Sequence, residues 1–158
     1  MTFSISCQVM DHLAALLQGT AAEGRSDIPG VGALFLDAGR VASKEDGVVL
    51  TLDQGGETPP PDEVIDTCRV RVEVPFFVEI FVPRVPGDAA NWRLLDPFYV
   101  AVHARIMANP RNLGGLCRNG GVTSVRRLLL EPDLQACGMR AYYNASILHD
   151  QTNVTVQR

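Results

Sequence analysis

The stretch from Thr67 to Pro83 alternates between apolar and polar side chains, and this pattern limits what the chain can fold into. Its even-numbered positions are all apolar: Cys68, Val70, Val72, Val74, Phe76, Val78, Ile80 and Val82. Successive side chains of a β-strand point to opposite faces, so the pattern predicts one long strand with a buried face and a polar face. Pro75 has no backbone N–H and predicts a bend or a sheet edge within it.

The polar face of this predicted strand also contains two aromatic side chains. Its charged members are Arg69, Arg71, Glu73 and Glu79. Phe77 and Phe81 interrupt them. Aromatic side chains in such positions predict a second contact on that face, made either by a helix of the same chain or by another subunit. Phe77 and Phe81 are therefore candidate interface residues.

Four other segments predict strands. Ala136–Leu148 shows the same period of two, with its odd-numbered positions apolar, and Val122–Leu130 precedes it. Val31–Leu36 and Val48–Leu52 are shorter and are separated by a polar turn around Lys44–Gly47. The three longer segments, including Thr67–Pro83, are expected to form the heart of a mainly antiparallel sheet.

Two segments show the apolar stripe of an amphipathic helix. The first stripe consists of Val9, Leu13, Leu16 and Leu17. The second consists of Phe98, Val102 and Ile106. Ser4 or Ser6 can cap the first helix and Gly19 can end it, whereas Asp96 is the expected N-cap of the second, with Pro97 as its first residue.

The order of these elements predicts the α+β class, with two helices packed on one face of a mainly antiparallel β-sheet. A length of 158 residues fits one domain, which we expect to span residues 1–148 and to be followed by a polar tail over residues 149–158. The net charge of −4 gives no reason to expect nonspecific binding to nucleic acid or membranes.

The sequence contains no recognisable catalytic or metal-binding pattern. Its four cysteines are scattered without a C-x-x-C pair, and its three histidines lack metal-ligand spacing. G-x-S-x-G and H-E-x-x-H motifs are absent, and a thiol–imidazole pair of Cys117 and His103 is a weak alternative. We therefore expect no enzymatic activity, no catalytic, cofactor-binding or metal-binding residues, and no cofactor.

A glycine-rich stretch, NPRNLGGLCRNGG, covers Asn109–Gly121. A phosphate-binding Walker A loop lies between a strand and a helix and ends in Lys-Ser or Lys-Thr. This stretch instead follows a predicted helix, precedes a predicted strand and lacks that ending. It predicts a structural turn in which Leu113 and Leu116 anchor the loop on the core while Gly114 and Gly115 turn the chain.

The segment Asp53–Asp66 is acidic and contains three consecutive prolines. Proline lacks a backbone donor and has a fixed φ, so we expect an extended, exposed loop here. It is either a tolerated surface insertion or an arm that contacts a partner.

The helix written LDPFYVAVHARIMANPRN, the following LGGL turn and the late strand MRAYYNASI resemble the tail terminator proteins of long-tailed bacteriophages. The turn consists of Leu113, Gly114, Gly115 and Leu116. The resemblance implies a virion protein that forms a homohexameric ring, caps the head-proximal end of the tail tube, stops its polymerisation and joins it to the head. It implies no catalytic residues to carry over.

The partners that the resemblance implies are other copies of this chain, the tail tube protein and the head–tail connector or stopper protein. Genomic DNA would pass through the ring without specific binding, and assembly would take place in the host cytoplasm without a membrane. A head-completion or stopper protein is the first alternative. A small cytosolic ligand-binding domain or enzyme is the second.

A ring requires two different patches on each subunit that fit one another. We expect an acidic patch on the arm, formed by Asp62, Glu63 and Asp66. We expect a basic patch on the last strands, formed by Arg126, Arg127 and Arg140. Phe77 or Phe81 would be the desolvated anchor of the contact.

Overall fold

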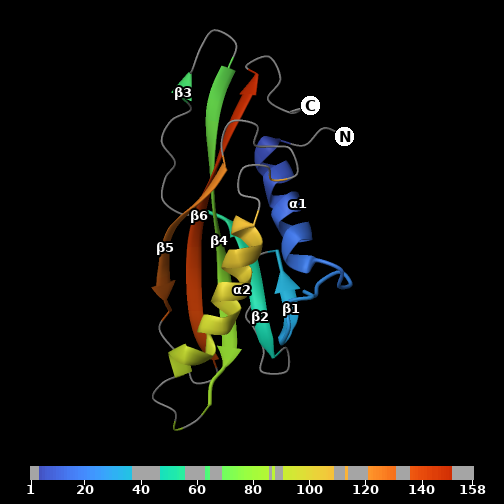
Figure 1. The fold of residues 1–158 in the computed structure, drawn as a ribbon, viewed down its shortest axis with the longest axis vertical. Coiled ribbons are helices and arrows are strands. Elements are labelled where there is room, and N and C mark those ends of the chain that lie inside the picture. The colour runs from blue at the N-terminus through green and yellow to red at the C-terminus, as the bar shows by residue number, and fades with distance from the viewer. Residues whose placement is uncertain are drawn as a thin grey trace.

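The computed structural model describes residues 4–36, 47–55, 63–64, 69–85, 87, 91–108, 113, 121–130 and 136–150. The helices are α1 (Ile5–Gln18) and α2 (Asp96–Met107), the latter preceded by a short 3-10 helix, Asn91–Leu94. The strands are β1 (Val31–Phe35), β2 (Val48–Gln54), β3 (Glu63–Val64), β4 (Arg69–Pro83), β5 (Gly121–Leu129) and β6 (Ala136–Asp150). Figure 1 shows their arrangement.

The strands form one sheet in the order β1-β2-β4-β6-β5, with β3 paired to the start of β4. Every pairing is antiparallel except that of β1 with β2, so the predicted α+β class is confirmed. The long strands β4 and β6 pair along their whole length, from Arg69 opposite Asp150 to Pro83 opposite Ala136. Because β6 continues to Asp150, the sheet extends two residues past the predicted domain boundary.

Both helices lie on one face of the sheet, as predicted (Figure 1). On that face the even-numbered side chains of β4 meet the odd-numbered side chains of β6, and most of both sets are buried. Phe76 stacks on Tyr143 with ring centroids 5.3 Å apart, and neither ring is more than 1% exposed. The centre of the core therefore lies between α2 and the β4–β6 pair.

The ends of α1 are those the sequence predicts. Ser4 has an extended backbone, and its hydroxyl accepts a hydrogen bond from the backbone N–H of Cys7. Gly19 ends the helix at a φ of +62°, a conformation that other residues adopt only with strain.

The start of α2 differs from the prediction. Leu95, not Asp96, is the N-cap, its backbone is already helical, and no side-chain cap bond forms. The 3-10 helix leads directly into α2, so the residue before α2 lacks the extended backbone that an N-capping side chain requires. Asp96 instead lies in the first turn, where its negative charge is favourable to the helix dipole.

Pro75 marks the end of the β2–β4 pairing, in agreement with the predicted edge. The Gly55 N–H donates to the Pro75 carbonyl at 3.1 Å, so the backbone of Pro75 faces β2. In an antiparallel pair the return bond would come from the N–H that proline lacks. The next pairing on this side of β4 is that of β3, at Val70 and Arg71.

A polar contact that the sequence analysis missed joins α2 to the end of α1. Arg105 in α2 forms an ion pair with Asp27 and also donates to the backbone carbonyls of Leu16 and Leu17. Asp27 in turn accepts from the backbone N–H of Thr20 at 2.9 Å. The last carbonyls of α1 thus accept hydrogen bonds from a cation, and a positive charge at the C-terminal end of a helix is stabilised by the helix dipole.

We expect the protein to lose stability in acid through Asp27. The backbone N–H of Thr20 and then the Arg105 guanidinium lower the pKa of this carboxyl to about 2. A pKa below that of the unfolded chain means that the contribution is complete above about pH 4 and disappears as the pH falls towards 2. Melting temperatures of the wild type and Asp27→Asn should therefore converge over this range. A constant difference between the two would contradict the assignment.

Candidate assembly surface

The face of the sheet opposite the helices contains Phe77, and side chains of the same chain cover it. Phe77 is only 8% exposed. The guanidinium of Arg140 lies 4.4 Å from its ring centroid, and the ring of Tyr142 lies beside it at 5.9 Å. The second contact expected at Phe77 is therefore made by β6, and this ring is not an exposed anchor.

Phe81 is half-buried on the same face, directly opposite Gly138 of β6. A Cβ atom at Gly138 would lie 2.9 Å from the Phe81 ring and 3.0 Å from Leu130. The missing side chain of Gly138 thus provides the space in which Phe81 packs, and much of its surface is already used within the chain.

Arg140 forms an ion pair inside the molecule. Its Nε donates to a carboxylate oxygen of Glu79 at 2.7 Å, and its Nη1 donates to the Tyr142 hydroxyl at 3.2 Å. Glu79 is 4% exposed, so this carboxylate depends on its partner for compensation. Arg140 is therefore committed to Glu79 rather than available to the acidic arm of a neighbour.

Glu79→Met is expected to lower the free energy of unfolding by about 2–3 kcal/mol, because it leaves the Arg140 charge without its carboxylate in a half-buried position. Adding Arg140→Met should restore part of that loss, since two apolar side chains can pack against Phe77. Urea denaturation of the single and double variants measures both the loss in the free energy of unfolding and its recovery. A double variant that loses the full sum of the two single losses would show that the pair is not coupled.

Arg126 and Arg127 are both exposed, but they point to opposite faces of the sheet. Arg126 lies opposite Tyr142 in the strand register, and its guanidinium carbon lies 4.8 Å from the centroid of the Tyr142 ring, on the face away from the helices. Arg127 lies 5.0 Å from the ring centroid of Tyr99 in α2 and 3.7 Å from the Asp96 carboxylate. Neighbours in a strand alternate between its faces, so the three arginines Arg126, Arg127 and Arg140 do not form a single patch on one face of the sheet. Their predicted role at a subunit interface stays a prediction.

Strand β5 is the edge of the sheet rather than part of its heart, and β2 takes the place beside β4. Seven successive residues of β5, from Thr123 to Leu129, are exposed. Three of them are large apolar side chains: Val125 at 49%, Leu128 at 48% and Leu129 at 56%. The sequence analysis missed these three residues, although the run VRRLL lacks the alternation that the buried strands show.

The acidic arm is only partly described. Asp62 and Asp66 lie outside the described residues, and the backbone of Glu63 belongs to β3, opposite Arg71. In the register of the sheet, Arg126 of β5 lies opposite Tyr142 of β6, and Tyr142 lies opposite Phe77 of β4. Phe77 is six residues along β4 from Arg71, the residue opposite Glu63. At about 3.3 Å per residue, Glu63 and Arg126 are about 20 Å apart along the strands. The described backbone of Glu63 is therefore well separated from that of Arg126.

The predicted turn is described only at Leu113, which is 3% exposed and belongs to the hydrophobic core. This agrees with its predicted role as an anchor. Leu113 itself has a φ of +32°, so part of the turn that was expected at the glycines is made by this residue. Gly114, Gly115, Leu116 and Cys117 lie outside the described residues.

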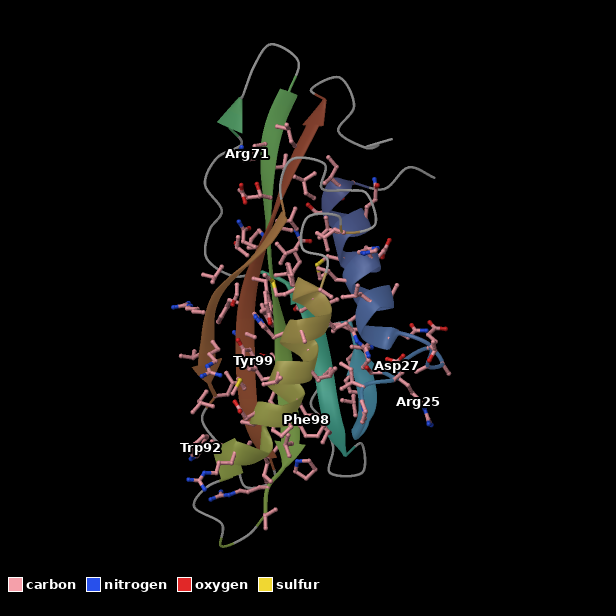
Figure 2. The ribbon with its side chains drawn as sticks, in the orientation of Figure 1. Arg25, Asp27, Arg71, Trp92, Phe98 and Tyr99 are labelled. Carbon is pink, nitrogen blue, oxygen red and sulfur yellow. The ribbon has the colours of Figure 1, made fainter. Side chains whose placement is uncertain are left out.

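His103 on α2 packs between the rings of Tyr99 and Tyr143, whose centroids lie 5.5 Å and 5.9 Å from the centroid of its own ring. Figure 2 labels Tyr99 on this helix. Its Nδ1 lies 3.2 Å from the hydroxyl of Tyr143, and burial raises the pKa of that phenol above its usual range. The imidazole thus satisfies a buried hydroxyl, which is a structural role. Among the described residues no group of three or more His, Cys, Asp or Glu side chains could hold a metal ion.

Comparisons with known proteins provide no family assignment. No protein-family model matches the chain, and no curated protein matches it either. In the described parts of the chain, no helix is long and apolar enough to cross a membrane.

Proposed function

We propose that this protein is a tail terminator of a long-tailed bacteriophage. It forms a ring on the head-proximal end of the tail tube, blocks addition of further tube subunits and presents a surface for the head connector. The motif resemblance around Leu113–Leu116 motivates the proposal, and the α+β fold with both helices on one face is compatible with it.

The observation that carries the proposal is the exposed strand β5. It presents three large apolar side chains, Val125, Leu128 and Leu129, along one edge of the sheet, about 20 Å along the strands from the backbone of Glu63 in β3. A protein that presents two different patches can join copies head to tail when one patch fits the other. Such a heterologous contact closes into a ring when the rotation allows it.

The charge distribution fits a conduit for DNA. With a net charge of −4, the chain has no excess of lysine and arginine with which to hold phosphates. We expect DNA to pass through the ring without specific binding.

The proposal is tested by mixing the purified protein with preformed tubes of the corresponding tail tube protein and imaging them by negative-stain electron microscopy. A ring at one end of each tube is the expected result, together with failure of capped ends to elongate when more tube subunits are added. Binding to isolated connectors but not to tube ends would support a stopper protein instead. A protein that stays monomeric and binds neither would contradict both assignments.

A further inference from the structure

The outward face of helix α2 is apolar, although it faces solvent. Figure 1 looks onto this face, and none of the described helices or strands is drawn in front of it. Trp92, just before the helix, is 52% exposed, and Val100 is 56% exposed. Residues four positions apart are neighbours on a helix surface. The exposed residues at this spacing, called the α2 ridge below, are Trp92, Asp96, Val100, Ala104 and Ala108.

The outward face of α1 shows the ordinary pattern for comparison. Its exposed residues, Cys7, Asp11 and Ala15, are flanked by the partly exposed and polar Gln8, His12 and Gln18. A helix that is apolar around its whole circumference is buried on all sides. Helix α2 already buries Val102 and Ile106 against the sheet, and its ridge contains a single charged residue. We therefore expect the α2 ridge to be covered by a partner.

The shape of the α2 ridge indicates which partner fits it. The ridge is bulky at its N-terminal end, where Trp92 lies, and small at its C-terminal end, where Ala104 and Ala108 lie. If a second copy lies antiparallel across a two-fold axis at Val100, positions equally distant from Val100 face each other. Trp92 of each copy then packs over Ala108 of the other, as ridges do in antiparallel helix pairs. The ridge is thus complementary in size to a second copy of itself.

The charges of α2 favour the same arrangement. The first turn of the helix contains the acidic Asp96, and the last turn contains the basic Arg105. Antiparallel pairing brings each acidic first turn alongside the basic last turn of the other copy and opposes the two helix dipoles. Parallel pairing would instead place Trp92 on Trp92 and Asp96 near Asp96. The contact leaves the ion pair of Asp96 with Arg127 in place.

We infer that two copies of this chain join through their α2 ridges, antiparallel about a two-fold axis near Val100. The contact goes beyond the proposed ring, because it joins identical patches and therefore closes after two copies. Trp92 is its anchor, since tryptophan is enriched among the residues that contribute most to binding. One helix ridge makes a small interface, so we expect the pair to form at micromolar concentrations and to dissociate on dilution.

Disulfide trapping tests the geometry of the pair. In a background in which every cysteine except the buried Cys137 is replaced by serine, Val100→Cys alone should give a dimer on a non-reducing gel. Trp92→Cys alone should stay monomeric, whereas Trp92→Cys combined with Ala108→Cys should give a dimer. These two positions are about 24 Å apart along the helix, too far for a disulfide within one chain. A dimer from Trp92→Cys alone would show parallel pairing and would overturn the inference.

A matched pair of alanine substitutions tests the assignment to α2. Ala104 on α2 and Ala15 on α1 are both exposed on the outward face of a helix. Ala104→Glu places a charge in the α2 ridge and should make the protein monomeric in sedimentation velocity at concentrations where the wild type is dimeric. Ala15→Glu should leave the dimer unchanged, and both variants should keep the circular dichroism spectrum of the wild type. A monomeric wild type, or equal effects of the two substitutions, would overturn the contact.

Trp92 also provides a direct signal, because it is the only tryptophan of the chain. Its fluorescence emission should shift to shorter wavelength as the wild type is concentrated and the indole leaves water. The emission of Ala104→Glu should not change with concentration. An emission maximum that stays constant while sedimentation shows dimers forming would place Trp92 outside the contact and overturn the inference.

The outcomes separate this inference from the proposed function. A dimer that Ala104→Glu abolishes, in a protein that does not cap tubes, would support the α2 contact and contradict the terminator assignment. A wild type that caps tubes but gives no dimer by sedimentation or by trapping at Val100→Cys would overturn the α2 contact and leave the terminator assignment standing.

Discussion

Phe76→Ala is expected to lower the free energy of unfolding by about 3–5 kcal/mol, a large part of the stability of a domain of this size. Phe76 is fully buried at the centre of β4 and stacks on Tyr143 of β6. Its removal would leave a cavity between the sheet and α2, and regular strands on both sides limit how far the surroundings can collapse into it.

Urea denaturation followed by circular dichroism measures this loss, and Val100→Ala is the control because Val100 is 56% exposed on α2. The control should change the free energy of unfolding by less than about 0.5 kcal/mol. If Phe76→Ala proved as mild as the control, the central position of the Phe76–Tyr143 stack would be wrong.

The long strands could be predicted because burial imposes a strict period on their sequences. In β4 and β6 one face is buried over most of its length, so the apolar residues recur at every second position. Phe76 and Tyr143 were therefore assigned to the buried face from the sequence alone. The apolar stripe of α1 was predictable for the same reason. Its ends at Ser4 and Gly19 were predictable because local backbone geometry determines them.

The opposite face of the sheet could not be predicted from periodicity. Phe77 stands among charged residues, and its burial depends on Arg140 and Tyr142, which are more than 60 positions away in the chain. The register of β4 and β6 brings these side chains together, and one sequence contains no direct signal for that register. The ion pair of Arg140 with Glu79 was not predicted from the sequence for the same reason.

Strand β5 was predicted as a strand but was wrongly placed in the heart of the sheet. Its arginine pair and leucine run break the alternation, and an edge strand tolerates this because only one of its sides must pair. The Arg105–Asp27 clamp was missed because it joins two side chains 78 positions apart, each of which is ordinary for an exposed helix or loop.

The central claim concerns the control of tube growth, and the largest functional effect is expected there. A terminator occupies the surface on which the next ring of tube subunits would assemble. Its removal should therefore leave tubes without a defined end point, so that they vary in length and lack the surface to which a head attaches.

The most direct measurement is the length distribution of tails in lysates of a phage from which this gene has been deleted, imaged by electron microscopy and compared with the complemented strain. The proposed function predicts tubes of variable, excessive length that are not joined to heads, with uniform joined tails restored by the wild-type gene and not by Leu129→Glu. Tails of normal, uniform length that join heads in the absence of this protein would contradict it.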